Sequence, residues 1–272
     1  MVIQTSDPIG IFDSGVGGLT VAAAVKQLLP DHPIVYFGDT AHLPYGDKSP
    51  EAILHYSKKI TDFLVQHNCK IILAACNTVS AAVWDDLSSY TYARQALPVN
   101  VIDPVAEQVG RQYPDSAIGV IGTKNTIRSG AYPLKIKSIA PKARVSSLAT
   151  PLLAPMIEEG FVYDDISNAI IKTYLSGRAL RDIDILILGC THYPIIRNQI
   201  LEYYNYRVEV VDSAKIVASH LCTIIKSENL PGRVYSGNAD KFFISDHTDY
   251  FEKIAETFFE KKIVLEKIDL WK

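Results

Sequence analysis

The sequence predicts an α/β protein with two pseudo-symmetric lobes, each a mainly parallel sheet flanked by helices, and an active site in the cleft between them. Short apolar runs alternate with longer segments of helical period, as in chains of strand–helix–strand units. Most of these runs are continuously apolar, which is typical of parallel strands buried on both faces. Part of the pattern also occurs twice within the 272 residues. That length fits one large or two small domains at roughly 150 residues each.

The expected strands are short runs, most of them rich in the β-branched residues that strands prefer. In chain order they are Ile9–Phe12, Ile34–Phe37, Ile71–Ala75, Val99–Ile102, Ile118–Ile121, Arg144–Leu148, Ile185–Leu188, Val208–Val211, Arg233–Tyr235 and Ile263–Leu265. Because helices separate most of them, neighbouring strands should pair in parallel.

The expected helices are segments in which apolar residues recur every three or four positions. In chain order they are Leu19–Leu29, Pro50–His67, Thr78–Tyr92, Pro104–Gln112, Asn125–Ala140, Pro151–Glu159, Asp164–Leu180, Ile196–Tyr203, Ser213–Ser227 and Thr248–Glu260. A helix start after Pro194 is favoured because proline suits the first helical position.

A weak internal repeat supports the two lobes. The segment Ile9–Ser14 resembles Ile118–Thr123, and Lys70–Thr78 resembles Asp184–His192. Buried parallel strands look alike by composition alone, which is the alternative explanation. Both pairs recur in the same order, however, so the sequence favours two similar lobes around one cleft.

Composition excludes several classes of protein. With 48% apolar residues and a net charge of −3, the chain is neither disordered nor collagen-like, and it lacks the basic surplus of a bulk nucleic-acid binder. We expect no membrane span, because no apolar run approaches the ~20 residues that one requires. The first residues lack the basic start and apolar run of a signal peptide. We therefore expect a cytoplasmic protein whose four cysteines, which form no CxxC motif, stay free thiols.

Polar clusters follow the predicted strands where ligands bind to open parallel sheets, at their carboxyl ends. The clusters are Asp13-Ser14-Gly15, Asp39 to Gly46, Cys76-Asn77-Thr78, Thr123 and Cys190-Thr191-His192. Helix starts near Thr78 and after Pro194 would offer free N–H groups to a carboxylate or phosphate. No arginine stands in these clusters, so we expect a small anion to be recognised by neutral donors.

Two cysteines differ from the others. Cys69 and Cys222 lie in apolar surroundings and are expected to be small buried hydrophobes. Cys76 and Cys190 each end a strand, have polar neighbours and are related by the repeat. Two thiols that face one carbon atom from opposite sides would suit stereoinversion, since one removes the Cα proton and the other returns a proton to the opposite face.

Thiols with an ordinary pKa are mostly neutral at pH 7, and a helix start ionises them only in part. Each thiol therefore needs a neighbouring proton acceptor or donor, and Asp13 and His192 are the candidates. A carboxylate beside a thiol raises the thiol pKa, so Asp13 suits the role of proton acceptor better than that of thiolate stabiliser.

Rival motifs fail. In Gly15-Val16-Gly17-Gly18, the third glycine of a dinucleotide-binding GxGxxG is replaced by Thr20. Neither a P-loop nor a GxSxG nucleophile motif is present. Cys190 and His192 could contribute to a zinc site, but the remaining ligands lack a recognisable spacing, so we expect no metal. A non-catalytic two-lobed binding protein remains an alternative, although a pure binder has no need of two related thiols.

Taken together, these segments resemble the glutamate racemases, cofactor-independent enzymes that make D-glutamate for peptidoglycan and thus for cell-wall biogenesis and cell shape. The matching segments are Gly10–Val21, Gly38–Gly46, Ala75–Thr78, Gly122–Thr123 and Gly189–Pro194. They follow the family's order and span most of the chain. The Asp-Ser-Gly-Val-Gly-Gly sequence at 13–18 favours glutamate racemase over the related aspartate and hydantoin racemases, which remain the alternative within the superfamily.

The resemblance implies a two-base proton transfer in which Cys76 acts on D-glutamate and Cys190 on L-glutamate. Asp13 and His192 would assist them, and a further catalytic glutamate of the family maps to Glu158, with the adjacent Glu159 as the alternative. Substrate contacts would come from Asp13, Ser14, Tyr45, Gly46, Asn77, Thr78, Thr123, Thr191 and His192.

The resemblance also implies the domain organisation and the partners. Residues 1–99 and 213–272 would form a discontinuous first lobe, and residues 100–212 the second. The substrate would be L- or D-glutamate, with no pyridoxal phosphate, metal, nucleotide or other cofactor, and with no need of nucleic acid or membrane. A homodimer is one assembly found among relatives, and inhibition of DNA gyrase is a separate role reported for some of them.

Overall fold

The computed structural model describes residues 7–227, 240–247, 259 and 263–272. Its first sheet has the strand order β10-β9-β2-β1-β3-β4, and every neighbouring pair is parallel. Its strands are β1 (Ile9–Asp13), β2 (Ile34–Gly38), β3 (Ile71–Ala74), β4 (Leu97–Asn100), β9 (Lys241–Ile244) and β10 (Leu265–Lys267). The described residues contain no helix with the length and apolar character needed to cross a membrane.

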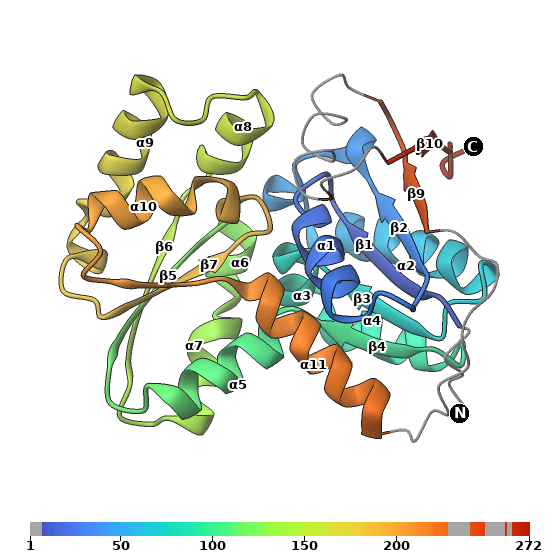
Figure 1. Cartoon of the computed structure of the whole chain (residues 1–272), viewed down its shortest axis with the longest axis horizontal. Helices are drawn as coiled ribbons and strands as arrows, with labels where there is room; N and C mark the ends of the chain where they lie inside the picture. Colours follow the sequence, from blue (N-terminus) through green and yellow to red (C-terminus); the bar gives the residue numbers. More distant parts are fainter. Residues whose placement is uncertain (1–6, 228–239, 248–258, 260–262) are drawn as a thin grey trace.

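The second sheet is also parallel and has the order β6-β5-β7-β8. Its strands are β5 (Ala117–Gly122), β6 (Arg144–Ala149), β7 (Ile185–Gly189) and β8 (Glu209–Val211). The run β2-β1-β3-β4 of the first sheet has the same order, with β1 matching β5 and β3 matching β7. These are the strands that the internal repeat relates. The two-lobed α/β fold is therefore confirmed, and the lobes lie side by side in Figure 1.

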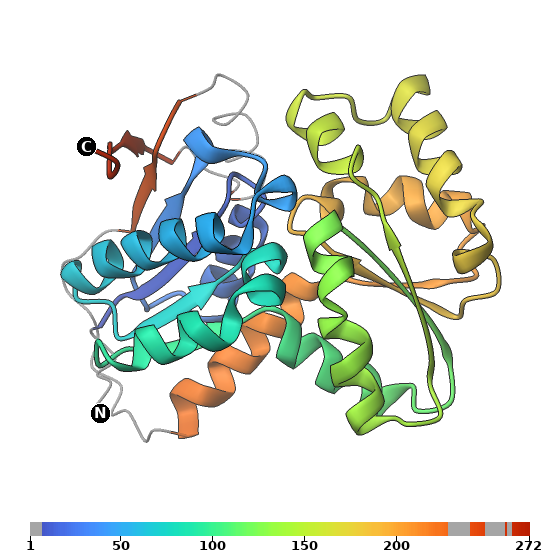
Figure 2. The same ribbon diagram turned by 180° about the vertical axis from the view of Figure 1, so that it is seen from behind.

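Helices cover both faces of each sheet (Figures 1 and 2). They are α1 (Leu19–Leu28), α2 (Pro50–Gln66), α3 (Asn77–Ala82), α4 (Trp84–Tyr92), α5 (Ile102–Gln112), α6 (Lys124–Ser129), α7 (Ala131–Ile139), α8 (Leu153–Glu158), α9 (Asp165–Leu175), α10 (Arg197–Tyr203) and α11 (Ser213–Ser227). Short 3₁₀ turns are η1 (Thr40–His42), η2 (Tyr45–Asp47), η3 (Arg178–Leu180) and η4 (Tyr193–Ile196). Helix α11 follows the last strand of the second sheet but packs against α1 and α5.

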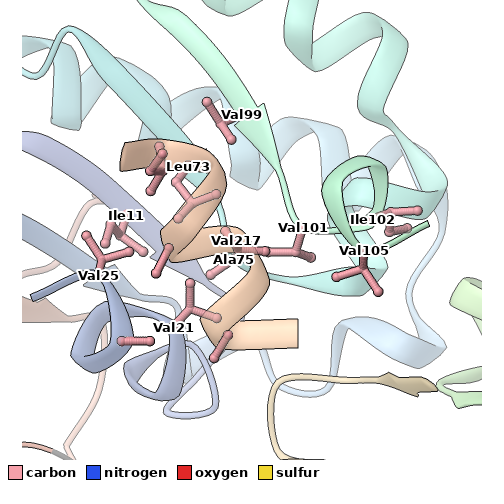
Figure 3. Packing of buried hydrophobic residues seen from close by; sticks show 14 of the residues in the cluster. Ile11, Val21, Val25, Leu73, Ala75, Val99, Val101, Ile102, Val105 and Val217 are labelled. Carbon is pink, nitrogen blue, oxygen red and sulfur yellow. The ribbon is translucent and has the colours of Figure 1, made fainter. Parts of the chain in front are cut away.

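One apolar core runs from the first lobe into the second. Figure 3 shows part of it: side chains of β1 and β3 meet those of α1 and α11, and the contacts continue to the start of α5. The labelled members are Ile11, Val21, Val25, Leu73, Ala75, Val99, Val101, Ile102, Val105 and Val217. The same core includes Ile118 and Val120 of β5. Each fully buried Val, Leu or Ile contributes about 1.5–3 kcal/mol to the stability of the fold. This shared core therefore fixes the position of the two sheets relative to each other.

Two helices expected to be continuous are each divided, and a third, predicted over Asp164–Leu180, ends as an α-helix at Leu175 before the 3₁₀ turn Arg178–Leu180. The predicted helix Thr78–Tyr92 is interrupted at Val83, whose φ and ψ are −140° and 17°. The predicted helix Asn125–Ala140 is interrupted at Gly130, whose φ of +68° is left-handed. Glycine adopts this conformation without a steric penalty. In both segments the apolar periodicity continues through the break, so periodicity alone could not locate it.

The fourth strand was placed two residues too late. The structure ends β4 at Asn100, whose side-chain Oδ1 accepts hydrogen bonds from the N–H groups of Ile102 and Asp103, both at 2.8 Å. These bonds satisfy the free donors of a helix start. Ile102 therefore begins α5 instead of ending the strand.

The C-terminal strands were only partly predicted. Strand β9 was missed, although its Phe-Phe-Ile sequence is a strand signal. Strand β10 covers Leu265–Lys267, two residues beyond the predicted Ile263–Leu265. The predicted strand Arg233–Tyr235 lies outside the described residues, and so does the predicted helix Thr248–Glu260 apart from Phe259.

Candidate active site

A small cavity lies where the carboxyl ends of the two sheets meet. Its volume is about 30 Å³, and both lobes line it. The lining residues are Ser14, Leu43, Pro44, Tyr45, Gly46, Cys76, Asn77, Thr78, Thr123, Ala154, Glu158, Cys190, Thr191 and His192. This volume holds about two water molecules, so the cavity in this conformation is too small for an amino acid. A wider groove of about 630 Å³ near Trp84 and Lys135 has no cysteine or histidine in its lining.

The two predicted cysteines reach this cavity from matching positions of the two lobes. Cys76 follows β3 at the start of α3, and Cys190 follows β7. Both are buried and line the cavity. Cys69 is instead packed beneath Gly10, and Cys222 lies on α11 near the carbonyl of Leu28. Neither of them lines the cavity, as the sequence predicted, but only Cys69 is buried: Cys222 is partly exposed, so the prediction that it is a buried hydrophobe was wrong.

Cys76 is surrounded by hydroxyl and carboxyl groups. Its Sγ lies 3.6 Å from the Oγ of Ser14, to which it can donate a hydrogen bond. Burial, and then the charge of Asp13, raise the pKa of Cys76 to about 12. At neutral pH, Cys76 is therefore a thiol, and it can act as a proton donor without further change.

Asp13 is completely buried beside this thiol. Its Oδ2 accepts the N–H of Gly18 at 2.7 Å and the hydroxyl of Thr191 at 3.2 Å, whereas Oδ1 has no hydrogen-bond partner among the described residues. Burial raises the pKa of Asp13, although the charge of His192 and the N–H of Gly18 oppose this. A carboxylate with a raised pKa and a free oxygen is suited to accept the thiol proton of Cys76.

Cys190 has a different partner. The Nδ1 of His192 lies 3.6 Å from the Cys190 Sγ, and its Nε2 lies 2.8 Å from Oε1 of Glu158. Burial disfavours the charged imidazole, but Glu158 and Cys190 outweigh it and hold the pKa of His192 well above its usual range. The structure thus places a positive charge beside the Cys190 sulfur. Glu158, and not the adjacent Glu159, is the glutamate that lines the cavity.

Most of the other predicted substrate residues also line the cavity. The hydroxyls of Thr78 and Thr123 lie 2.9 Å apart and join the two lobes. Thr123 also caps α6, because its hydroxyl accepts the N–H of Thr126 at 3.3 Å. Gly46 lies against Thr123 so closely that a Cβ on Gly46 would be 2.8 Å from the Thr123 Cβ. A side chain at Gly46 would therefore push the two walls apart.

The glycine-rich segment packs closely against a loop of the second lobe. A Cβ on Gly17 would lie 2.4 Å from the Oγ1 of Thr191 and 2.7 Å from the Nδ1 of His192. Real Cβ atoms do not approach other atoms so closely. The segment that imitates a nucleotide-binding loop is thus shaped for contact between the lobes.

Three residues beside the site were not predicted as site residues. Asp39 accepts the hydroxyl of Tyr45 at 2.6 Å. Asn125 donates from Nδ2 to the carbonyls of Tyr45 at 3.2 Å and Lys48 at 2.8 Å. Tyr132 donates its hydroxyl to Oδ1 of Asn77 at 2.8 Å. Asp39 begins one of the polar clusters identified in the sequence but was given no role there. Asn125 stands near a strand end and could have been suspected, but the helical position of Tyr132 gave no signal.

Tyr132 orients the Asn77 amide. With Oδ1 held by Tyr132, the Nδ2 of Asn77 is buried and has no partner among the described residues. We expect Tyr132→Phe to raise KM for the substrate about three- to tenfold, the effect of losing one buried hydrogen bond. Steady-state kinetics of each enantiomer would measure this. Tyr113→Phe, which removes an exposed hydroxyl bonded to Glu209, should leave KM unchanged, and an equal KM in all three proteins would contradict the role of Tyr132.

Apart from the imidazolium of His192, the hydrogen-bond donors that line the cavity are neutral. No lysine or arginine is among its lining residues in the described part of the chain. The described residues also contain no group of three or more His, Cys, Asp or Glu side chains placed to hold a metal ion. A bound anion would therefore contact hydroxyl, amide and backbone N–H groups, together with the imidazolium of His192.

Two parallel-sheet lobes that close on one cavity, with a thiol from each, indicate a class of enzyme, the amino-acid racemases. The model of the Asp/Glu/hydantoin racemase family matches residues 19–221. The chain belongs to this family and, within it, to the glutamate racemases.

The relatives that support this assignment match nearly the whole chain. The glutamate racemase of Geobacter metallireducens is 40% identical over 256 residues, which are 94% of this chain and 93% of the relative. Crystal structures of glutamate racemases from Francisella tularensis and Bacillus anthracis are 35% and 33% identical, with TM-scores of 0.88 and 0.89. Each covers 98% of this chain and 99% of its own. An aspartate racemase from Picrophilus torridus, at 20% identity over 84% of this chain and 96% of its own with a TM-score of 0.56, shares the fold alone.

Proposed function

We propose that this chain interconverts L- and D-glutamate by two-base proton transfer, with Cys76 and Cys190 as the two bases. One observation carries the proposal: two thiols from equivalent strand ends line one cavity, and each has its own acid–base partner. A single base would be poorly placed to serve both faces of the substrate Cα.

The proposed reaction of L-glutamate begins at Cys190. Its thiolate, stabilised by the imidazolium of His192, removes the Cα proton and leaves a carbanion. The neutral thiol of Cys76 then donates a proton to the opposite face. The reverse direction requires a thiolate at Cys76, and Asp13 accepts the proton that this thiol must lose. The assignment of each cysteine to one enantiomer rests on the resemblance to the family.

Recognition of the substrate is proposed to use neutral donors from both lobes. The hydroxyls of Ser14, Thr78, Thr123 and Thr191, and the unpartnered amide of Asn77, suit the two carboxylates of glutamate. The first N–H groups of η2 have no acceptor within the turn and can add to them. The Francisella tularensis relative was crystallised in complex with D-glutamate, which supports glutamate over aspartate as the substrate.

The remaining expectations are part of the same proposal. We place the lobe boundaries near residues 100 and 212, and the protein in the cytoplasm, where it would supply D-glutamate for peptidoglycan. The reaction would need no cofactor, and a homodimer is one assembly to test. The strand ends of both sheets face one cavity, which agrees with a substrate bound between the lobes.

The activity is tested by circular dichroism. Purified protein is expected to bring pure L-glutamate and pure D-glutamate to the same racemic end point, at which the signal vanishes, in buffer without pyridoxal phosphate. L-Aspartate under identical conditions should keep its signal. Loss of the aspartate signal with retention of the glutamate signal would favour an aspartate racemase, and binding of glutamate without any change of signal would favour a non-catalytic binding protein.

A further inference from the structure

A buried carboxylate outside the catalytic groups organises one wall of the cavity. Asp39 follows β2 and is completely buried. Its Oδ2 accepts the hydroxyl of Tyr45 at 2.6 Å, and its Oδ1 accepts the hydroxyl of Ser245 at 2.8 Å. The Nδ1 of His42 lies 2.9 Å from both oxygens. Three side chains thus converge on one carboxylate.

One of these partners comes from the C-terminal part of the chain. Ser245 directly follows β9, and it lies 206 positions from Asp39 in the sequence. The Ser245 hydroxyl oxygen also accepts the N–H of Ala41 at 2.9 Å. Next to it, the Thr40 hydroxyl donates to the carbonyl of Asp246 at 2.6 Å and accepts its N–H at 2.7 Å. The end of β9 is therefore bonded to the segment that leads to the cavity.

A second partner, Tyr45, lines the cavity itself. Its ring is buried, and burial and the charge of Asp39 raise the pKa of Tyr45 well above its usual range. The hydroxyl thus stays protonated and donates to Asp39, so it is not available to a substrate. Tyr45 and Gly46 both line the cavity, and Asn125 and Thr123 of the second lobe contact this turn.

We propose that Asp39 is a positioning residue for glutamate racemisation. Through the Tyr45 hydroxyl, Asp39 fixes the Tyr45–Gly46 wall of the substrate site. Through Ser245, it connects this wall to the C-terminal strand β9. The inference rests on the proposed function. Moving the wall should weaken ground-state and transition-state contacts to the substrate equally, because the wall lies beside the two thiols and contains neither of them. The expected result is a higher KM with little change in kcat.

The test compares Asp39→Asn, Ser245→Ala and Tyr45→Phe in the full-length protein. Asparagine keeps the shape of Asp39 but loses the charge, and we expect KM for both enantiomers to rise about tenfold while kcat changes less than about threefold. Ser245→Ala removes one of three donors and should raise KM about threefold. Tyr45→Phe removes the hydroxyl through which Asp39 holds the wall, so it should also raise KM, and the double variant Asp39→Asn/Tyr45→Phe should raise KM by less than the product of the two single effects, because the two changes share one bond.

Thr40→Val is the matched control. It removes a hydroxyl that joins the same segment to Asp246 but makes no contact with Asp39. We expect its KM to stay within about twofold of the wild type, since only exposed bonds are lost. Thermal unfolding of every variant separates a general loss of stability from a displaced wall.

Three results would overturn the inference: unchanged KM in Asp39→Asn, a fall in kcat at constant KM, or an equal KM increase in Thr40→Val. If Asp39→Asn does not fold, KM of Ser245→Ala and the double-mutant cycle of Ser245→Ala with Tyr45→Phe test the inference in its place. Absence of racemisation in the wild type would instead overturn the proposed function, so the two failures can be told apart.

Discussion

Replacement of either Cys76 or Cys190 by serine is expected to lower the rate of glutamate racemisation by about a thousandfold or more. A serine hydroxyl is much less acidic than a thiol, so each variant loses the acid–base group on one face of the Cα. The structure places both sulfur atoms in the lining of one cavity, and its lining contains no further cysteine among the described residues that could replace either of them. Cys222→Ser, on α11 outside the cavity, is the matched control and should retain full activity.

Exchange of the substrate α-proton in deuterated water distinguishes the two thiols. Cys76→Ser retains Cys190, so it should still exchange the α-proton of L-glutamate without inverting it. Cys190→Ser should do the same for D-glutamate only. Proton NMR measures the exchange, and circular dichroism measures the inversion. Full racemisation by both serine variants would refute the two-base mechanism.

A comparison of kcat/KM in the two directions would not reveal this asymmetry. The two enantiomers have equal free energies in water, so the equilibrium constant is unity, and kcat/KM must remain equal in both directions for every variant. A one-sided defect can therefore appear only in kcat, in KM or in isotope exchange. For this reason the exchange experiment, starting from each enantiomer, is the decisive measurement.

His192→Asn is expected to lower kcat about a hundred- to a thousandfold, within the range of a lost general acid–base group. Asparagine cannot carry the positive charge that lies between Glu158 and Cys190. The thiolate of Cys190 would then lose its stabilising cation. The rates of racemisation from both enantiomers measure the effect, and kcat within tenfold of the wild type would contradict the role of His192.

Glu158→Gln tests the same group through pH. Burial alone would lower the pKa of His192, and Glu158 is the largest influence that raises it. Without this carboxylate the pKa should fall, so the imidazolium is lost at lower pH and the alkaline decline of kcat/KM should move to lower pH. Glu159→Gln is the matched control, because Glu159 does not line the cavity. A shift with Glu159→Gln, and none with Glu158→Gln, would reverse the assignment.

The strands show how much of the fold can be predicted from local sequence patterns. Apolar runs placed β1, β3, β5 and β7 to within a residue or two, because a strand buried on both faces must be apolar along its length. Their similarity also indicated that β1 matches β5 and β3 matches β7, and the structure shows these strands in equivalent places of a four-strand order that both sheets contain. The divisions at Val83 and Gly130 were missed because a helix that turns a corner can keep its apolar period.

By itself, the sequence determined the fold class and the two thiols at the strand ends, because strand burial and the polar residues that follow a strand are local features of the chain. Only the tertiary structure decided the partners of those groups. The bonds from Tyr132 to Asn77, from Asn125 to Tyr45 and from Ser245 to Asp39 join residues 55, 80 and 206 positions apart. A hydrogen bond between distant segments leaves no periodic trace in either one, since each side chain must only be polar and its partner is selected by the packing of the two lobes.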